Sequence, residues 1–222
     1  MILCLVTDRR RLCSAVGGRP ADAFDLLIQQ IGGAVAGGVD LIQVREPDLE
    51  AKELLVLVRR ILASVPDSAS RLVVNDRLDV ALVSGAAGVH LKESSFAVHD
   101  ARRISPPSFI VGKSVHGPET ARVQAGASYL IAGTVKATSS KPPGRYLGYD
   151  GLAAVVDAAG LLPVLAIGGL SLSDAPIVAG TGAKGMAVIG AFIPDGDLDL
   201  GPFVHNQAEK LRFAFDSVGR VT

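Results

Sequence analysis

The sequence has few cysteines, no excess of either charge and no long hydrophobic run, and each of these absences excludes a class of protein. Its two cysteines, Cys4 and Cys13, form neither a disulfide framework nor a zinc-ligand spacing, so we expect reduced structural thiols. The 22 lysine and arginine residues balance 22 acidic residues, so the composition predicts neither a nucleic-acid partner nor an anionic lipid surface. Any anion that the protein binds must be held by local groups.

The apolar segments of the chain are short. The N-terminal run MILCLV has six apolar residues and no basic segment before it, so we expect no signal peptide. No window reaches about 18 apolar residues without charge or turn signals, so we expect no membrane partner. The sequence therefore predicts a cytoplasmic protein. Its hydrophobic content of 49% and mean hydropathy of +0.38 predict a large core.

Eight apolar runs recur along the sequence. They are rich in branched aliphatic residues and do not alternate with polar residues, which is typical of strands buried on both faces of a parallel sheet. The predicted strands are residues 2–6, 41–44, 71–75, 88–91, 109–115, 129–133, 163–169 and 185–190.

The segments between these runs carry apolar residues at helical spacing. Asp48 is a candidate N-cap for the second of these segments, and residues 9–20 are the most loop-like part of the chain. The predicted helices are residues 21–36, 49–64, 76–84, 98–104, 118–126, 149–159, 172–180 and 203–216.

Eight strand–helix pairs predict an α/β protein, a single (β/α)8 TIM barrel that spans residues 1–222. A doubly wound open sheet is the alternative, but no glycine-rich dinucleotide fingerprint follows the first strand. In TIM barrels the chemistry takes place at the carboxyl ends of the strands. The polar residues in or after the predicted strands are Thr7, Asp8, Gln43, Arg45, Glu46, Asn75, Asp76, His90, Lys92, Glu93, Lys113, Ser114, His116, Thr134, Lys136, Thr138, Ser140 and Lys141.

Glycines at the ends of the last two predicted strands indicate a phosphate site. The loops after the seventh and eighth strands of a barrel often hold phosphate with backbone N–H groups, and glycine allows a close approach. The predicted cup consists of Gly168, Gly169, Ile189 and Gly190. Tight turns without a ligand are the alternative. Ser171 and Ser173 could cap the helix that follows.

The polar loop at Thr138, Ser140 and Lys141 is either a second anion contact or a solvated loop. Arg45 either pairs with Glu46 at the barrel rim or grips a carboxylate or phosphate group.

Asp76 could contribute to a magnesium site, but a single carboxylate seldom suffices, so we favour a helix cap. His116 is either a general acid/base or a structural residue, and His90, inside a strand, is more typical of a structural residue.

The motifs together resemble one family. They are LVTD (5–8), QVRE (43–46), NDR (75–77), GVHL (88–91), GKSVH (112–116), the stretch from Gly133 to Lys141, AIGG (166–169) and GMAVIG (185–190). In this order and spacing they resemble the thiamin phosphate synthase/TenI family over nearly the whole chain. The resemblance implies a (β/α)8 barrel of thiamin biosynthesis that binds a phosphorylated thiazole at the glycine cup.

The resemblance covers two branches of that family. The synthase branch joins a hydroxymethylpyrimidine diphosphate to thiazole phosphate and uses Mg²⁺. Its pattern Q-x-R-x-K has Pro47 in place of the lysine, and its pattern G-V-H-x-G-x-x-D has Ser95 in place of the aspartate. Both losses affect the diphosphate, whose departure needs cations. The thiazole phosphate side is kept, so we favour the TenI branch, which the segment from His90 to Phe96 also resembles.

The TenI branch implies a thiazole tautomerase, an isomerase that aromatises a thiazole carboxylate phosphate by proton transfer without a cofactor. His116 would then move the proton and Arg45 would orient the carboxylate, with Gln43 and Asn75 as further substrate contacts. The alternative is a thiamin phosphate synthase that holds Mg²⁺ with Asp76 and Glu93. A third hypothesis is a barrel that binds a phosphate ligand without catalysis. The expected partner is a small thiazole phosphate, and the sequence leaves open whether the chain forms a homodimer.

Overall fold

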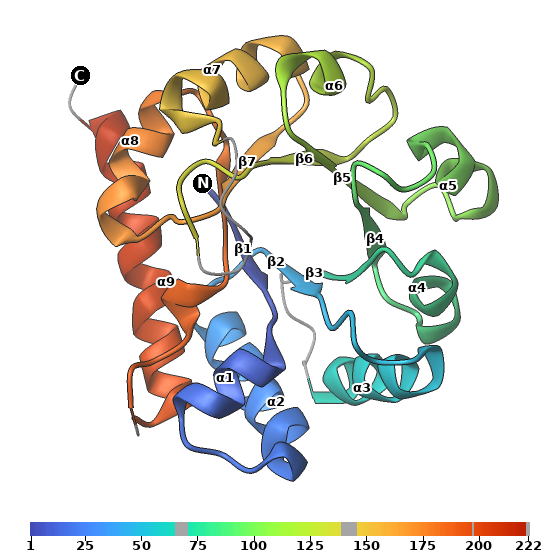
Figure 1. Ribbon diagram of the computed structural model, residues 1–222, viewed down its shortest axis with the longest axis vertical. Helices are drawn as coiled ribbons and strands as arrows, with labels where there is room; N and C mark the ends of the chain where they lie inside the picture. Colours follow the sequence, from blue (N-terminus) through green and yellow to red (C-terminus); the bar gives the residue numbers. More distant parts are fainter. Residues whose placement is uncertain (65–70, 139–145, 197, 221–222) are drawn as a thin grey trace.

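A computed structural model describes residues 1–64, 71–138, 146–196 and 198–220. Eight parallel strands close into a barrel in sequence order, and β1 pairs with β8 as well as with β2 (Figure 1). The predicted (β/α)8 barrel is confirmed. The strands are β1 Ile2–Val6, β2 Leu41–Val44, β3 Arg71–Asn75, β4 Gly88–Leu91, β5 Ile110–Val115, β6 Tyr129–Ala132, β7 Val164–Ile167 and β8 Gly185–Val188.

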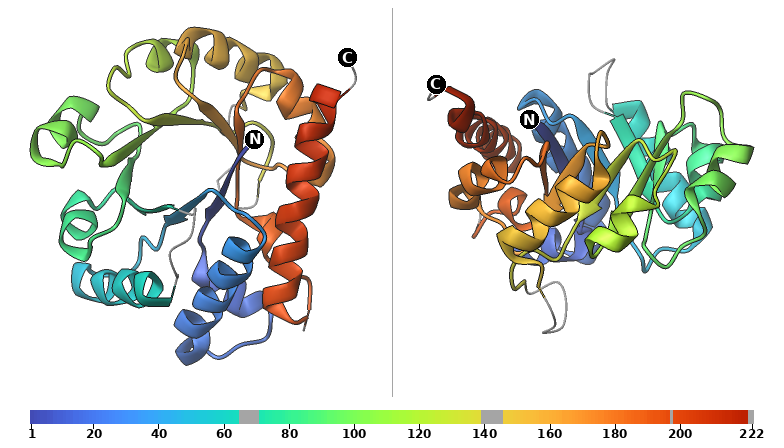
Figure 2. Two further views of the ribbon diagram at one scale, coloured as in Figure 1. Left: turned by 180° about the vertical axis from the view of Figure 1, so that it is seen from behind. Right: turned by 90° about the horizontal axis from the view of Figure 1, so that it is seen from above.

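The helices form a ring around the barrel, and α9 runs along one side of it, packed against α2 and α8 (Figures 1 and 2). The α-helices are α1 Arg9–Ala15, α2 Ala23–Ala36, α3 Ala51–Ser64, α4 Leu78–Ser84, α5 Val98–Ile104, α6 Pro118–Arg122, α7 Gly148–Ala159, α8 Ala175–Gly180 and α9 Leu200–Asp216. Short 3-10 helices are η1 Pro20–Asp22, η2 Leu172–Asp174, η3 Gly190–Phe192 and η4 Ser217–Arg220.

Two apolar layers hold the fold together, as the runs without alternation predict for a sheet covered on both faces. The inner layer fills the barrel and includes Val6, Val73, Ile131 and Leu165. The outer layer lies between strands and helices, where side chains such as Leu57 on α3 are fully buried. Filled in this way, the barrel is a packed core, and an opening is left to its ends.

The prediction that residues 9–20 form a loop is wrong for their first part, because α1 begins at Arg9, with only Thr7 and Asp8 between it and β1. The Asp8 side chain accepts a hydrogen bond from the Arg11 backbone N–H and so caps the helix. Leu12 and Cys13 are buried on its inner face. One short turn of apolar residues among three arginines gives too weak a periodic signal to be recognised in the sequence.

Two predicted helix caps are also wrong. The helix after β2 begins at Ala51 rather than at residue 49, and the Asp48 carboxylate instead binds Arg9 and Arg10. The helix after β3 begins at Leu78 with Arg77 at the N-cap position. Asp76 adopts a left-handed backbone with φ of 63° and makes other contacts, described below.

No helix in the described part of the chain combines the length and the apolar character needed to cross a membrane.

Candidate active site

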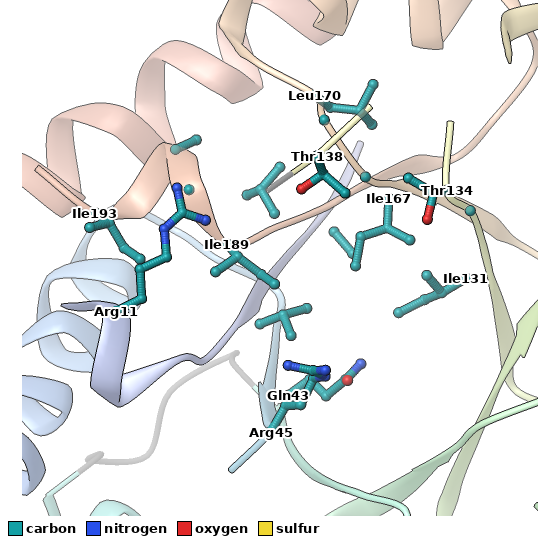
Figure 3. A pocket seen from close by; sticks show the side chains of 18 of the residues that line it. Arg11, Gln43, Arg45, Ile131, Thr134, Thr138, Ile167, Leu170, Ile189 and Ile193 are labelled. Atoms are coloured by element: carbon teal, nitrogen blue, oxygen red, sulfur yellow. The ribbon is translucent and has the colours of Figure 1, made fainter. Parts of the chain in front are cut away.

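A pocket of about 1120 Å³ opens at the carboxyl ends of the strands, where the barrel fold predicts chemistry. Figure 3 shows Gln43 and Arg45 on one side of it, with Thr138 and Leu170 across from them. Pockets for one drug-sized ligand measure roughly 300–1,000 Å³, so this one has room for two small molecules. The predicted residues that line it are Gln43, Arg45, Asn75, His116, Thr138, Gly168, Gly169, Ile189 and Gly190. The predicted contacts Ser140 and Lys141 lie outside the described residues.

The glycines after β7 are required by close packing. Gly168 and Gly169 have positive φ values of 103° and 65°. A Cβ atom on Gly169 would lie 2.2 Å from the Ala137 carbonyl oxygen, and one on Gly168 would lie 2.4 Å from the Thr134 methyl group. Larger residues would push the loops after β6 and β7 apart. The alternative of tight turns therefore explains part of the need for glycine at these positions. The same packing brings Thr138 to the cup.

Ser171 takes the expected N-cap position, at the start of η2. Its backbone N–H donates to Asp174, and its hydroxyl group also contacts that carboxylate at 2.7 Å. Lys136 extends to the same Asp174 carboxylate at 2.8 Å. The loop after β6 is thus tied to the turn after β7.

Arg11 is a pocket residue that the sequence analysis missed. Its Nη2 atom lies 3.1 Å from the place where a Cβ on Gly190 would be, and Figure 3 shows its side chain beside Ile189 and Ile193. Among the described residues its guanidinium group forms no salt bridge. It therefore adds a positive charge to the cup. A helix predicted directly after the first strand would have indicated that Arg11 lies near the cup.

The β2 side of the pocket offers a cation and a hydrogen-bond donor. The Gln43 side chain is buried, and its Nε2 has no hydrogen-bond partner within the described part of the chain. Arg45 is partly exposed and forms no salt bridge with any described residue. An unpaired buried amide is costly unless a ligand satisfies it.

Arg45 does not pair with Glu46, which was one of the two interpretations of this motif. The Glu46 carboxylate turns away from the pocket to Arg9 at 2.9 Å and to the Thr7 hydroxyl at 2.6 Å. Burial raises the pKa of Glu46, and its hydrogen bonds from Thr7 and Arg9 offset only part of that effect. Arg45 is thereby left to the pocket.

Asp76 binds a lysine and a serine. Its carboxylate lies 2.6 Å from the Lys92 Nζ atom and accepts a hydrogen bond from the Ser95 hydroxyl. Burial raises its pKa, but the hydrogen bonds from Lys92 and Ser95 outweigh burial and hold the pKa below its usual value. This ion pair is the contact that replaces the expected helix cap.

The residues around Asp76 do not fit the magnesium site that the family resemblance implies. Magnesium usually takes one or two carboxylates and further oxygens in an octahedron, whereas both Asp76 oxygens are engaged by hydrogen-bond donors. Glu93, the other carboxylate of the synthase alternative, lies 2.9 Å from His116 Nδ1. Within the described ranges no group of three or more acidic, histidine or cysteine side chains could hold a metal.

His116 lines the pocket as half of a pair with Glu93, which also accepts a hydrogen bond from the His116 backbone N–H. Burial raises the pKa of Glu93, but hydrogen bonds from Thr120 and His116 outweigh it and lower the pKa.

The second histidine, His90, is enclosed between Tyr129 and Ser114 at 3.1 and 2.9 Å. Burial, together with the charge of Lys113, lowers its pKa to about 3. His90 is therefore neutral and hydrogen-bonded, in line with the expectation of a structural residue. Lys113 itself donates to the Ser95 and Phe96 carbonyl oxygens, so its ammonium group holds the loop after β4.

Fold and site together define a (β/α)8 barrel with a polar pocket at the carboxyl ends of its strands and cations on two sides. The family model described as thiamine monophosphate synthase matches residues 13–192. The chain belongs to this family, which confirms the family-level resemblance found in the sequence.

Individual relatives agree with the family match. The chain is 42% identical over 173 residues to the thiamine-phosphate synthase of Methanoculleus marisnigri, covering 74% of this chain and 79% of that protein. It is 37% identical over 174 residues to the thiamine-phosphate synthase of Coprothermobacter proteolyticus, covering 78% and 82%. The solved structure of thiamine phosphate pyrophosphorylase from Pyrococcus furiosus superposes with a TM-score of 0.78 at 30% identity, covering 98% of this chain and 96% of that one.

These relatives overturn the preference for a thiazole tautomerase. Proteins 37–42% identical to this chain are named as synthases, which are transferases, and none of these names describes an isomerase. The prediction was wrong because Pro47 and Ser95 were counted as lost diphosphate contacts. The sequence does not show which other side chains take the places of the missing lysine and aspartate. The alternative, a thiamin phosphate synthase, is the hypothesis that the comparisons support.

Proposed function

We propose that this protein is a thiamin phosphate synthase, which joins a hydroxymethylpyrimidine diphosphate to a thiazole phosphate and releases diphosphate. In this reaction a bond forms between the pyrimidine methylene carbon and the thiazole nitrogen. The carbon–oxygen bond to the diphosphate breaks, and the diphosphate leaves with the electron pair. The observation that carries the proposal is a single pocket with anion-binding groups on two sides, because both substrates are phosphorylated.

The thiazole phosphate is assigned to the cup at Gly169 and Gly190. Backbone N–H groups at such a turn bind phosphate well, and Arg11 adds a guanidinium group suited to phosphate oxygens. Thr138 contributes a hydroxyl group from the loop after β6. Ser140 and Lys141 follow Thr138 in the sequence and are assigned to the phosphate on the strength of the sequence motif.

The pyrimidine diphosphate is assigned to the opposite side. The unpaired Gln43 amide would donate to an acceptor on the pyrimidine ring, and Asn75 lines the same wall. Arg45 and Lys92 line the pocket, and both are assigned to the leaving diphosphate. Cations fixed where negative charge develops lower the barrier for departure of such a group.

The proposal is tested by mixing the purified protein with both substrates and measuring thiamin phosphate and inorganic diphosphate over time. We expect the two products in equal amounts, and none when either substrate is omitted. Arg45→Gln should lower kcat/KM by about 10- to 100-fold, because a hydrogen-bonded charge contributes roughly 1.5–3 kcal/mol. Binding of both substrates without turnover, whether or not Mg²⁺ is added, would contradict the proposal.

A further inference from the structure

The two positions that contact Asp76 both depart from the family pattern. In G-V-H-x-G-x-x-D the residue at the position of Lys92 is glycine, and the residue at the position of Ser95 is aspartate. The two side chains meet at one carboxylate, where Lys92 Nζ lies 2.6 Å from Asp76 and the Ser95 hydroxyl donates to its other oxygen. These departures are therefore parts of one local rearrangement.

The formal charge of the cluster is the same in both arrangements. Two carboxylates and one divalent cation sum to zero, and so do one carboxylate and one lysine. The ammonium group is a compact cation held at hydrogen-bond distance from the carboxylate. Lys92 also supplies a cation at the rim of a pocket whose family lysine is replaced by Pro47.

The loop after β4 fixes Lys92 in this place. The Ser95 backbone N–H donates to the Lys92 carbonyl oxygen at 3.1 Å and closes a turn that presents both side chains to Asp76. Lys113 donates to the carbonyl oxygens of Ser95 and Phe96 at 3.1 and 3.2 Å and anchors the far end of the turn. The Lys92 side chain stays 53% exposed and lines the pocket, so it is accessible to an anion.

We infer that Lys92 takes the position of a divalent cation at Asp76, and that this protein binds the diphosphate group of its substrate without a metal. The inference rests on the proposed function for the identity of the substrate. The paired contact with Asp76 positions the ammonium group, and Arg45 supplies the second cation from β2. This assigns Lys92 as a diphosphate-binding residue and makes the diphosphate end of the pocket independent of Mg²⁺.

The test is calorimetric titration with inorganic diphosphate, in EDTA and in Mg²⁺. We expect the wild-type protein to bind in EDTA with a Kd within about threefold of that in Mg²⁺. Lys92→Gln should weaken binding in EDTA about tenfold, which is the effect of one moderate charge contact, while Lys92→Arg should stay within about threefold. Lys184→Gln is the matched control, since Lys184 is an exposed lysine directly before β8, at the opposite end of the barrel.

A double variant tests the exchange in reverse. Lys92→Gly combined with Ser95→Asp restores the family pattern around Asp76, so diphosphate binding should become dependent on Mg²⁺ and drop at least tenfold in EDTA. Wild-type binding that requires Mg²⁺, or Lys92→Gln binding as tightly as wild type in EDTA, would overturn the inference.

An activity assay separates this inference from the proposed function. Thiamin phosphate formation that persists in EDTA supports both. Formation that stops in EDTA and returns with Mg²⁺ supports the synthase and overturns the role of Lys92. No formation under either condition overturns the synthase, while the diphosphate titration still decides whether Lys92 binds the anion without metal.

Discussion

Arg11 brings a positive charge to the glycine cup from a helix that sequence patterns did not reveal. We expect Arg11→Ala to raise the KM for thiazole phosphate by about 10- to 100-fold, because a hydrogen bond to a charged group contributes roughly 1.5–3 kcal/mol. The kcat should change less than about threefold, since in the proposed reaction the bond forms at the thiazole nitrogen and not at the phosphate group. Steady-state kinetics with varied thiazole phosphate and saturating pyrimidine diphosphate measure both constants.

The neighbouring arginine provides the control for Arg11. Arg10 is 73% exposed and pairs with Asp48 at 2.8 Å, so Arg10→Ala removes the same charge from the same helix without altering the cup. It should leave the KM for thiazole phosphate within about twofold of wild type. An equal rise in both variants would show that the overall charge of α1, and not a contact of Arg11, affects binding.

The proposed coupling reaction with diphosphate release requires no proton transfer by His116. We therefore expect His116→Asn to keep kcat within about threefold of wild type in the synthase assay. A residue that serves as general acid or base contributes about 10²–10⁴-fold, so a loss of a hundredfold or more would contradict this expectation. The asparagine also retains a side-chain amide donor toward Glu93, which limits disturbance of the pocket rim.

Residue by residue, the sequence predicted which side chains reach the pocket better than it predicted their partners. Gln43, Arg45 and His116 line the pocket as expected, because each follows or lies at the end of a strand. The partners of Glu46 and Asp76 come from other elements, and spacing along one chain does not encode such contacts. Lys92 was noted in the sequence, but its contact with Asp76 depends on the register of β3 against β4.

At the scale of elements, Asp174 connects three segments around the cup. It binds Lys136 at 2.8 Å, the Tyr149 hydroxyl of α7 at 2.5 Å and the backbone N–H of Ser171 at 2.8 Å. Burial of the carboxyl group raises its pKa, but the contacts with Lys136, Tyr149 and Ser171 outweigh burial and hold the pKa well below its usual range. Asp174 thus stabilises the fold in its ionised form.

The lowered pKa of Asp174 predicts how stability changes with pH. The contribution is present above the unfolded-state value of 3.8 and is lost as the pH falls toward the folded-state pKa. Asp174→Asn should lower the free energy of unfolding by about 2 kcal/mol at pH 7, since it removes charged hydrogen bonds. The gap from wild type should shrink by about 1 kcal/mol at pH 3.

Urea unfolding of both proteins at pH 7, 4 and 3 measures that gap. Asp157→Asn is the control, because Asp157 is an exposed acid on α7 that forms no salt bridge among the described residues. Its gap from wild type should stay within about 0.5 kcal/mol at all three pH values. A gap for Asp174→Asn that is constant or grows on acidification would mean that the carboxyl group is not stabilised in its charged form.

Over the whole molecule, the barrel could be predicted because the same pattern recurs eight times. Runs such as residues 71–75 match their strands completely, whereas the run 163–169 extends past β7, which ends at Ile167. The two residues of the run that lie beyond the end of β7 are glycines, and they turn the chain back toward the loop after β6. A linear pattern counts them with the strand, and only the packing against Thr134 and Ala137 shows why they belong to the turn.

The packing contact between α2 and α9, called the seam below, joins the first part of the barrel to the last. Its close approach depends on glycine. A Cβ atom on Gly33 of α2 would lie 2.4 Å from the Gly201 carbonyl oxygen of α9, whereas one on Gly32 would meet nothing within 4 Å. The two glycines are neighbours in one helix, so alanine has the same helix propensity advantage at both, about 0.5–1 kcal/mol. Any difference between the two substitutions must therefore come from packing against α9.

We expect Gly32→Ala to raise the free energy of unfolding by about 0.5–1 kcal/mol and Gly33→Ala to lower it by about 1–3 kcal/mol, because overpacking a close helix contact forces the backbones apart. Chemical denaturation followed by circular dichroism measures both changes. The opposite signs test the seam, since equal stabilisation by both substitutions would mean that α9 can move away from α2 without loss. In that case the two ends of the barrel would be held together by the β1–β8 pairing rather than by the helices that cover it.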